Sequence, residues 1–339
     1  MKKYLQVLGV ISCLAVVLLH SNGVFWAFSY ERYWFTANII ESICYFAVPI
    51  FIMISGCNLI DYQKKYNTKI YFKKRIIKTV IPFFIWSFIG FVYLLTVGAL
   101  STDNINIHSV VDAVFNTGYI GVYWFFIPLF SVYLSIPALS MIPEASRKRI
   151  FQYMLLAAFA FNIAMPFVFS IIGLNYNTQL NVSLVGGYLF YAIAGYYIDR
   201  YPIEKKYRVI CYVLAGVGLA AHILGTLGLS YRDGAVNSVF KGYLNLPCVL
   251  YSVGIFVLFK YLDKTRVMEY LYTITFPASD TTFGIYLIHW FLMDSFLRIS
   301  HINPTSIVYR IVGGLAIFIA ASIIIKIIKK IPILRQIVP

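Results

Sequence analysis

The chain has 339 residues, of which 60% are hydrophobic and only 12% are charged, and its formal net charge is +15. A soluble domain carries about 45–50% apolar and about 25% charged residues. This composition therefore excludes a soluble globule, and lipid must solvate much of the exterior. The basic residues fall in short clusters between apolar segments, which argues against a nucleic-acid partner.

Ten apolar segments follow one another along the chain, each of roughly the length (~20 residues) that a helix needs to cross the hydrocarbon core of a bilayer. We predict an all-α integral membrane protein with about ten transmembrane helices, forming one transmembrane domain over residues 1–339 with no appended soluble domain. The sixth and ninth segments are short. The predicted spans are 4–28, 37–60, 79–100, 122–142, 151–174, 183–198, 209–229, 244–262, 281–296 and 304–325.

The charges between these segments alternate from one side to the other. One side collects the basic clusters at 2–3, 64–78, 147–149, 200–208, 260–266 and 326–335. The positive-inside rule places that side in the cytoplasm, together with both termini. We expect a multi-pass protein of a bacterial plasma membrane, in contact with membrane lipids. The opposite side keeps only Arg32, Arg232, Lys241, Arg298 and Arg310.

The five cysteines all lie within apolar segments. They show neither metal-ligand nor disulfide spacing, so we interpret them as small core residues and expect no metal site.

Polar side chains inside an apolar segment are costly in lipid and are functional candidates by default. His20 lies about two-thirds of the way along the first segment, and Glu41 lies one turn into the second, at a similar depth. A carboxylate there can accept a hydrogen bond from the imidazole, fix its tautomer and raise its basicity. Two simpler interpretations stay open: a structural histidine bonded to a neighbouring helix, and an interfacial carboxylate exposed to water.

A basic stretch leads into the third segment. Arg75 and Lys78 are three residues apart and share a helix face at the predicted cytoplasmic surface. With Lys74 beside them, they suit the phosphates of a cofactor. The alternative is a signal for membrane topology, which fully explains the charges over 64–74 but explains less well a basic pair at the entry to a span.

Another candidate inside a span is His289, which lies in the middle of the ninth segment.

Several stretches, taken in order, resemble the acyltransferase-3 family of membrane acyltransferases. The resemblance covers the whole chain, although each piece is short. Its parts are 4–20 in the first span, VPIFIMISG at 48–56 in the second, the basic entry at 72–82 to the third, YWFFIPL at 123–129 with Tyr133, Leu134 and Pro137 in the fourth, Gly195-Tyr196-Tyr197, and 279–289.

This resemblance implies a ten-span fold that takes an acyl group, usually acetyl, from cytoplasmic acyl-CoA and delivers it to a hydroxyl of a glycan or lipid-linked sugar. The family's presumed catalytic histidine corresponds to His20. It would act as general base on the acceptor hydroxyl, which attacks the thioester carbonyl, and Glu41 would orient it. Lys74, Arg75 and Lys78 would hold the phosphates of acetyl-CoA.

The resemblance also suggests an acceptor site. Tyr123, Trp124 and His289 are the predicted substrate-binding residues, with the aromatic pair stacking on sugar rings. Many aromatic residues near span ends instead form the interfacial belt of a membrane protein. The chain departs from the family pattern at Gly9, where an arginine is usual eleven positions before the histidine, and at Lys78, where a second arginine is usual.

We therefore predict O-acetylation of a cell-surface polysaccharide or its lipid-linked precursor. Two other classes of function remain open. One is a transporter or exporter of a glycan or small metabolite, since intramembrane His and Glu also serve proton relays. The other is a catalytically silent relative that assists glycan assembly.

Overall fold

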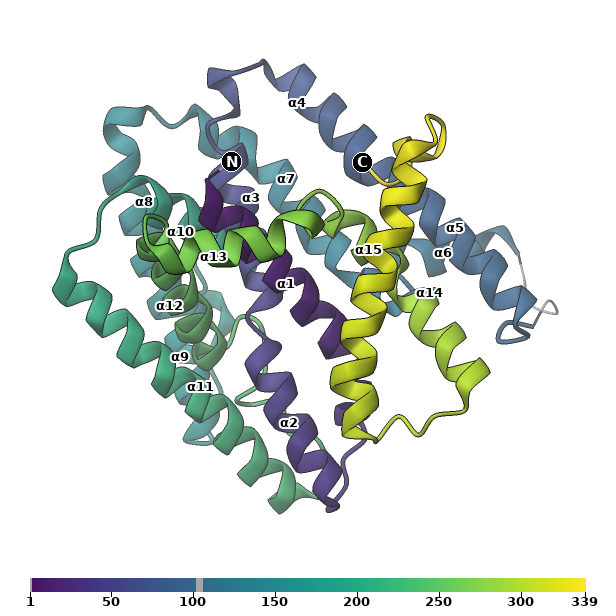
Figure 1. Ribbon diagram of the computed structural model, residues 1–339. Coiled ribbons are helices and arrows are strands. Elements are labelled where there is room, and N and C mark those ends of the chain that lie inside the picture. The colour runs from purple at the N-terminus through teal and green to yellow at the C-terminus, as the bar shows by residue number, and fades with distance from the viewer. Residues whose placement is uncertain (1, 102–105) are drawn as a thin grey trace.

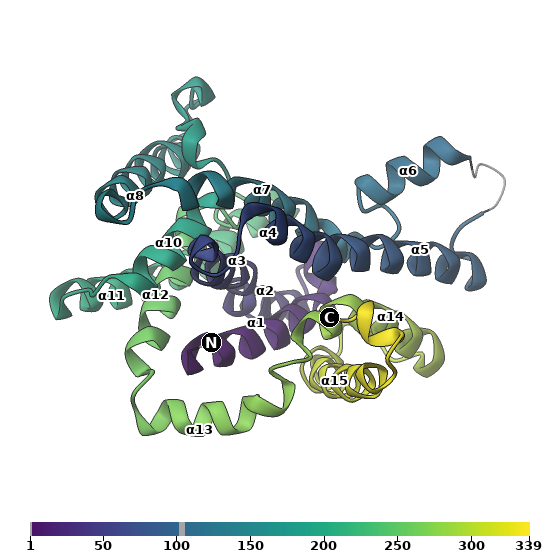
Figure 2. The same cartoon turned by 90° about the horizontal axis from the view of Figure 1, so that it is seen from above.

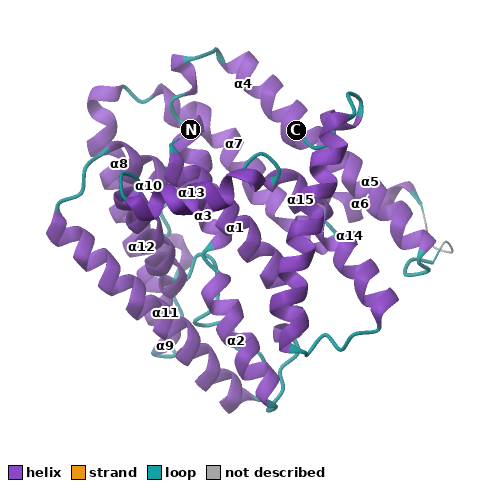
Figure 3. Cartoon of the chain, in the orientation of Figure 1, coloured by secondary structure: helices purple, strands orange, loops and turns teal. Residues whose placement is uncertain are grey.

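The computed structural model describes residues 2–101 and 106–339, and this part of the chain contains helices and no strands (Figures 1 and 3). Helices satisfy every backbone hydrogen bond within one segment, which lipid requires. The predicted all-α membrane class is thus confirmed. The α-helices are α1 Lys3–Ser21, α2 Arg32–Cys44, α3 Ala47–Leu59, α4 Thr68–Arg75, α5 Ile81–Thr96, α6 Ile107–Phe115, α7 Phe126–Met141, α8 Glu144–Ala158, α9 Met165–Ile171, α10 Leu189–Arg200, α11 Lys205–Asp233, α12 Leu246–Leu262, α13 Arg266–Thr275, α14 Thr282–Ser300 and α15 Gly314–Lys330.

Seven helical stretches in the described residues are long and apolar enough to cross a membrane. An eighth is obtained if α12 and the segment Arg266–Ala278, which meet at a bend of 107°, count as one broken span. Several of these stretches contain two neighbouring helices with a π turn or a short irregular segment between them. The seven are Lys3–Ser21, Arg32–Lys64, Thr68–Thr96, Gly121–Met141, Glu144–Ile171, Lys205–Asp233 and Tyr309–Lys330.

The two short predicted spans, the sixth and the ninth, correspond to α10 and α14, which do not meet those criteria by themselves. α10 has only 12 residues and begins at Leu189, after an irregular stretch rather than at residue 183. α14 has 19 residues but carries the ion pair Arg298–Asp294 in its outer half, with Nε and Oδ2 2.6 Å apart. The count of ten spans stays a prediction for these two helices.

Both termini lie at the same end of the bundle, the end where α4 also lies (Figure 1). The loops that follow α1 and α14 lie at the opposite end. α1 runs through the middle and packs against α2, α3 and the helices from α12 to α15. Seen from above, α3 and α10 lie side by side next to it, whereas α6 stands apart beside α5 (Figure 2).

Glycine permits a close contact between α3 and α10. A Cβ on Gly56 of α3 would lie 1.9 Å from the carbonyl oxygen of Ala192, and a Cβ on Gly195 of α10 would lie 2.3 Å from that of Met53. The two backbones can approach this closely because each contact has a glycine, without a side chain, on one of the two helices. The Ser-Gly and Gly-Tyr-Tyr pieces of the sequence therefore have a packing role.

Proline breaks the helices at two positions that matter for the site. Pro49, in the first turn of α3, has no N–H to donate to the carbonyl of Tyr45, so the helix breaks between α2 and α3. The thiol of Cys248 donates to that carbonyl instead, at 3.7 Å. Pro128, in the first turn of α7, likewise follows the short helical turn Gly121–Phe125, which contains Trp124.

Candidate active site

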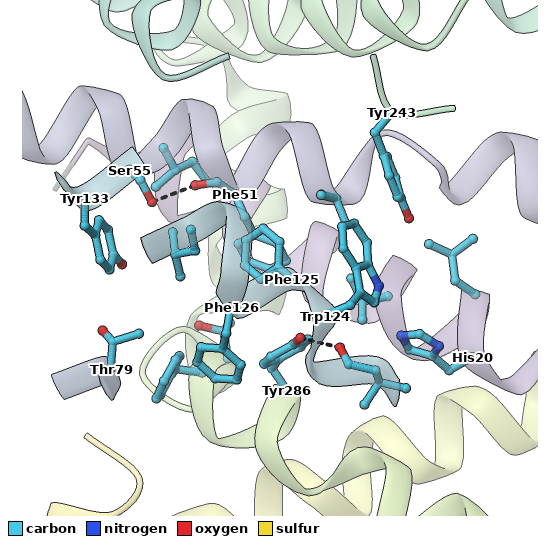
Figure 4. Close-up of a pocket in the computed structure, with 18 of the residues that line it drawn as sticks. His20, Phe51, Ser55, Thr79, Trp124, Phe125, Phe126, Tyr133, Tyr243 and Tyr286 are labelled. Atoms are coloured by element: carbon cyan, nitrogen blue, oxygen red, sulfur yellow. Dashed lines mark hydrogen bonds between the residues drawn. The ribbon is translucent and has the colours of Figure 1, made fainter. Parts of the chain in front are cut away.

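A cavity of about 550 Å³ lies inside the bundle. Its wall is formed by α1, α2, α3, the π turn Ile76–Val80 between α4 and α5, α7 with the turn before it, and α14. Tyr133 and Thr79 lie toward one end, and His20 and Tyr243 lie toward the other (Figure 4). Five of the eight predicted site residues reach this wall: His20, Glu41, Arg75, Lys78 and Trp124.

His20 occupies the last turn of α1 and faces the cavity (Figure 4). No group of the described residues forms a hydrogen bond with its imidazole. The ring lies against that of His289, with centroids 5.2 Å apart. A neutral imidazole has one nitrogen that accepts a proton, and in His20 none of the residues that the structure describes competes for it. The arrangement suits a general base.

His289 is buried behind His20 and does not form part of the cavity wall. Its Nδ1 lies 2.7 Å from the carbonyl oxygen of Tyr286 and 3.1 Å from that of Ile285. Since carbonyls only accept hydrogen bonds, Nδ1 carries the proton and Nε2 is the acceptor nitrogen. Nε2 is buried and has no partner. His289 thus supports the ring of His20 from outside the cavity wall, and its role in substrate binding stays a prediction.

Glu41 has a different partner from the one predicted. Its carboxylate lines the cavity, and its Oε2 accepts a hydrogen bond from Nδ2 of Asn22 at 3.3 Å. It forms no hydrogen bond with His20. Asn22 follows α1 directly, two residues beyond His20, and this position turns its amide toward α2. The predicted orienting contact from Glu41 to His20 is therefore replaced by a contact to Asn22.

The cations occupy the end of the cavity marked by Tyr133 and Thr79. The guanidinium of Arg75 lies 5.4 Å from the centroid of the Tyr133 ring, and its Nε is buried without a partner. Lys78 lines the wall on the π turn. Lys74 does not reach the cavity, because its Nζ lies over the ring of Tyr66 at 3.8 Å.

None of Lys74, Arg75 and Lys78 forms an ion pair with a described residue. This end can therefore hold a polyanion without first breaking a salt bridge. In the same part of the chain, no group of three or more His, Cys, Asp or Glu residues could hold a metal ion.

An aromatic stack forms the wall near His20. The rings of Tyr45 and Tyr243 are 4.1 Å apart and nearly parallel, and Trp124 stacks on Tyr243 at 5.4 Å. All three line the cavity. The predicted partner of Trp124, Tyr123, does not: it is buried, and its hydroxyl donates to the carbonyl of Leu287 at 2.6 Å. Tyr243 and Tyr45 had no distinguishing signal in the sequence, because belt aromatics have the same spacing.

Two residues predicted among the outer loop charges are in fact buried. Lys241 is 3% exposed, and its Nζ lies 3.3 Å from Nε2 of His222 and over the ring of Tyr45. Arg310 is 1% exposed. Lys241 lies in a loop that folds back onto α11, and Arg310 lies in the π turn Tyr309–Gly313 at the start of the last span. The charge pattern alone could therefore not separate them from solvated residues. The one available signal was their rarity, since the outer side of the chain carries few cations.

The fold and the site define a helical membrane protein with a histidine, free cations and an aromatic stack around one internal cavity. Comparison with protein families agrees with this description: residues 2–326 match a family model described as an acyltransferase domain. The chain belongs to this acyltransferase-3 family and is a membrane acyltransferase. Comparisons with curated proteins and with solved structures found no match.

Proposed function

We propose that this protein transfers an acetyl group from cytoplasmic acetyl-CoA to a hydroxyl of a cell-surface polysaccharide or of its lipid-linked precursor, in the plasma membrane of a bacterium. The observation that carries the proposal is the placement of His20. It lies on the wall of the same cavity as the unpaired cations, at the end that holds the aromatic stack, and no described residue forms a hydrogen bond with its imidazole.

The cation end suits the donor. Acetyl-CoA carries phosphates on a long pantetheine arm, and Arg75 and Lys78 offer positive charge that no carboxylate of the described residues neutralises. Both residues belong to the segment on the side of the chain that the basic clusters mark as cytoplasmic. The thioester would then extend along the cavity toward His20.

The stack end suits the acceptor. The faces of Trp124 and Tyr243 offer flat apolar surface to a sugar ring, and Glu41 offers a carboxylate to its hydroxyls. His20 removes the proton of the attacking hydroxyl as its oxygen bonds to the thioester carbonyl carbon. The tetrahedral intermediate then loses the sulfur, the thiolate takes the proton back from His20, and the products are the acetyl ester and coenzyme A.

The test uses the purified protein in lipid vesicles with acetyl-CoA and with glycan extracted from cells that lack the gene. We expect coenzyme A thiol to appear only when glycan is present, and alkali-labile acetate to appear on the glycan in equal amount. In cells, deletion of the gene should lower the acetyl ester content of the surface glycan, and the intact gene should restore it.

Two outcomes would contradict the proposal. Glycan that enters vesicles without thiol release would point to a transporter. A deletion that lowers glycan acetylation, together with purified protein that releases no thiol, would point to a silent partner of another enzyme.

A further inference from the structure

A chain of buried polar groups connects the last span to Glu41. Arg310 donates from one terminal nitrogen to Oδ1 of Asn22 at 3.1 Å and from the other to Oγ1 of Thr36 at 2.7 Å. Asn22 in turn donates from Nδ2 to the carbonyl of Ala37 at 2.9 Å and to Oε2 of Glu41 at 3.3 Å. The path therefore runs from a guanidinium through an amide to a carboxylate.

The cost of this arrangement indicates that it has a function. A buried guanidinium in the membrane is expensive, and such residues mark functional sites. Arg310 has no acidic partner among the described residues, and its Nε has no partner at all. A structural anchor would more simply pair with a carboxylate. The guanidinium is instead directed at the neutral oxygen of Asn22.

The backbone around Arg310 is built to place it there. Arg310 lies in the π turn Tyr309–Gly313, a local widening of the helix that often occurs at functional sites. Its carbonyl accepts a hydrogen bond from Oγ of Ser21 at 2.8 Å, which joins the turn to the end of α1. A Cβ on Gly314 would lie 2.7 Å from that same hydroxyl oxygen, so the close approach of the two helices depends on glycine.

Arg310 determines which way the amide of Asn22 faces. Because a guanidinium only donates, the oxygen of Asn22 must point to Arg310, and its NH₂ group must point to Glu41. Oε2 of Glu41 is thereby held, while Oε1 has no hydrogen-bond partner in the described residues. Glu41 lines the cavity that also contains His20 and the aromatic stack. Oε1 is thus left free to accept a hydrogen bond from a bound molecule.

We infer that Glu41 binds the acceptor, with Oε1 accepting a hydrogen bond from a hydroxyl of a sugar-like ring, and that Arg310 and Asn22 are positioning residues that hold it in this orientation. The inference rests on the proposed acetyl transfer. It replaces a role for Glu41 in orienting His20 with a role in acceptor affinity.

The experiment changes which atom of the residue-41 side chain faces the cavity, an oxygen that accepts a hydrogen bond or an NH₂ group that does not. In Glu41→Gln, Asn22 still donates to the side-chain oxygen of residue 41, so the new NH₂ group faces the cavity and cannot accept a hydrogen bond. In the double variant Asn22→Asp with Glu41→Gln, the new carboxylate accepts from both Arg310 and the amide of residue 41. The hydrogen bond to the carbonyl of Ala37 is lost in this variant, which lowers stability but leaves the carboxylate to set the direction of the amide. The amide then turns, and its oxygen faces the cavity again.

Acetyl transfer to extracted glycan is measured against glycan concentration and against acetyl-CoA concentration. We expect Glu41→Gln to raise the KM for glycan by at least about tenfold, as loss of a hydrogen bond to a charged group would, with the KM for acetyl-CoA unchanged within about twofold. The double variant should recover most of the glycan affinity. Arg310→Met should raise the KM for glycan as Glu41→Gln does.

Thermal unfolding in detergent separates affinity from folding, and Arg298→Met is the matched control, because Arg298 is an exposed arginine paired with Asp294 outside the cavity. A double variant no better than Glu41→Gln would overturn the inference while leaving acetyl transfer intact. Equal changes in both KM values would also overturn it. No transfer by the unaltered protein would instead remove the proposed function, and the inference with it.

Discussion

The imidazole of His20 is half-buried against a second histidine and forms no hydrogen bond with any described residue. His289 is held by two backbone carbonyls, so its proton lies on Nδ1, and Nε2 has no partner in the described residues. Its ring packs on His20 and restricts the orientation of that ring. A base that must take a proton from a substrate benefits from this combination, because nothing has to be displaced first.

If His20 is the general base, His20→Ala should lower the rate of acetyl transfer by about 10²–10⁴-fold. The amount of folded protein and the binding of acetyl-CoA, measured by titration calorimetry, should stay close to those of the unaltered protein. His108→Ala is the control, since His108 is exposed on α6 and away from the cavity. Full acetylation by the His20→Ala protein would refute the mechanism.

The unpaired cations lead to a second prediction. Arg75→Ala combined with Lys78→Ala should raise the KM for acetyl-CoA by at least about tenfold, because each lost charge-assisted hydrogen bond to a phosphate contributes about 1.5–3 kcal/mol. Binding by the unaltered protein should weaken with added salt, since screening acts on partly exposed contacts.

The control for this pair is Lys69→Ala with Lys73→Ala, which removes two exposed charges of the same helix that do not line the cavity. It should leave the KM for acetyl-CoA unchanged. Equal effects of the two double variants would mean that the basic stretch acts only through its total charge or through membrane topology.

At the scale of elements, the contact between α3 and α10 depends on glycine. Gly56→Ala or Gly195→Ala would push a methyl group into a backbone carbonyl of the facing helix, where neither side can yield. We expect each to destabilise the protein by about 1–3 kcal/mol or more, seen as a lower temperature of unfolding in detergent and a lower yield.

Gly9→Ala is the matched control on α1. Its Cβ would meet only the Cδ1 atom of Ile54 at 3.9 Å, an ordinary contact. Alanine within a helix is more favourable than glycine by roughly 0.5–1 kcal/mol, so stability should be unchanged or slightly higher. Similar losses in all three variants would contradict the packing explanation for Gly56 and Gly195.

For the whole molecule, the open question is which end of the bundle faces the cytoplasm. Both termini and α4 lie at one end (Figure 1), and the basic clusters predict that this end is cytoplasmic. A cysteine placed at Asn67 should then be protected from a membrane-impermeant maleimide in intact cells, and one at His108 should be labelled. Asn104, four positions before His108 in the sequence, lies outside the described residues.

The control is permeabilised cells, in which both positions should react. The native cysteines are buried or half-buried, and the unaltered chain measures any labelling that they contribute. Labelling at Asn67 but not at His108 in intact cells would invert the topology and place the unpaired cations on the outer side, away from cytoplasmic acetyl-CoA.

What the sequence alone determined is local. An apolar stretch bounded by charges forms a membrane helix wherever it lies in the chain, because lipid requires each backbone hydrogen bond to close within the segment. The helical class and most helix positions were therefore predictable. The sequence also singled out His20, Arg75 and Lys78, which line the cavity, since each is a costly or clustered polar group beside or inside an apolar segment.

The tertiary structure determined which side chains meet. Asn22 and Arg310 are 288 positions apart in the chain yet form a hydrogen bond. Asn22 also donates to Glu41, and this second contact stands in place of the predicted one between Glu41 and His20. Lys241 was expected in an outer loop, and its burial beside His222 depends on how that loop folds back onto α11. Hydropathy and charge clustering are properties of neighbouring residues, whereas these partners are selected by the packing of helices distant in sequence.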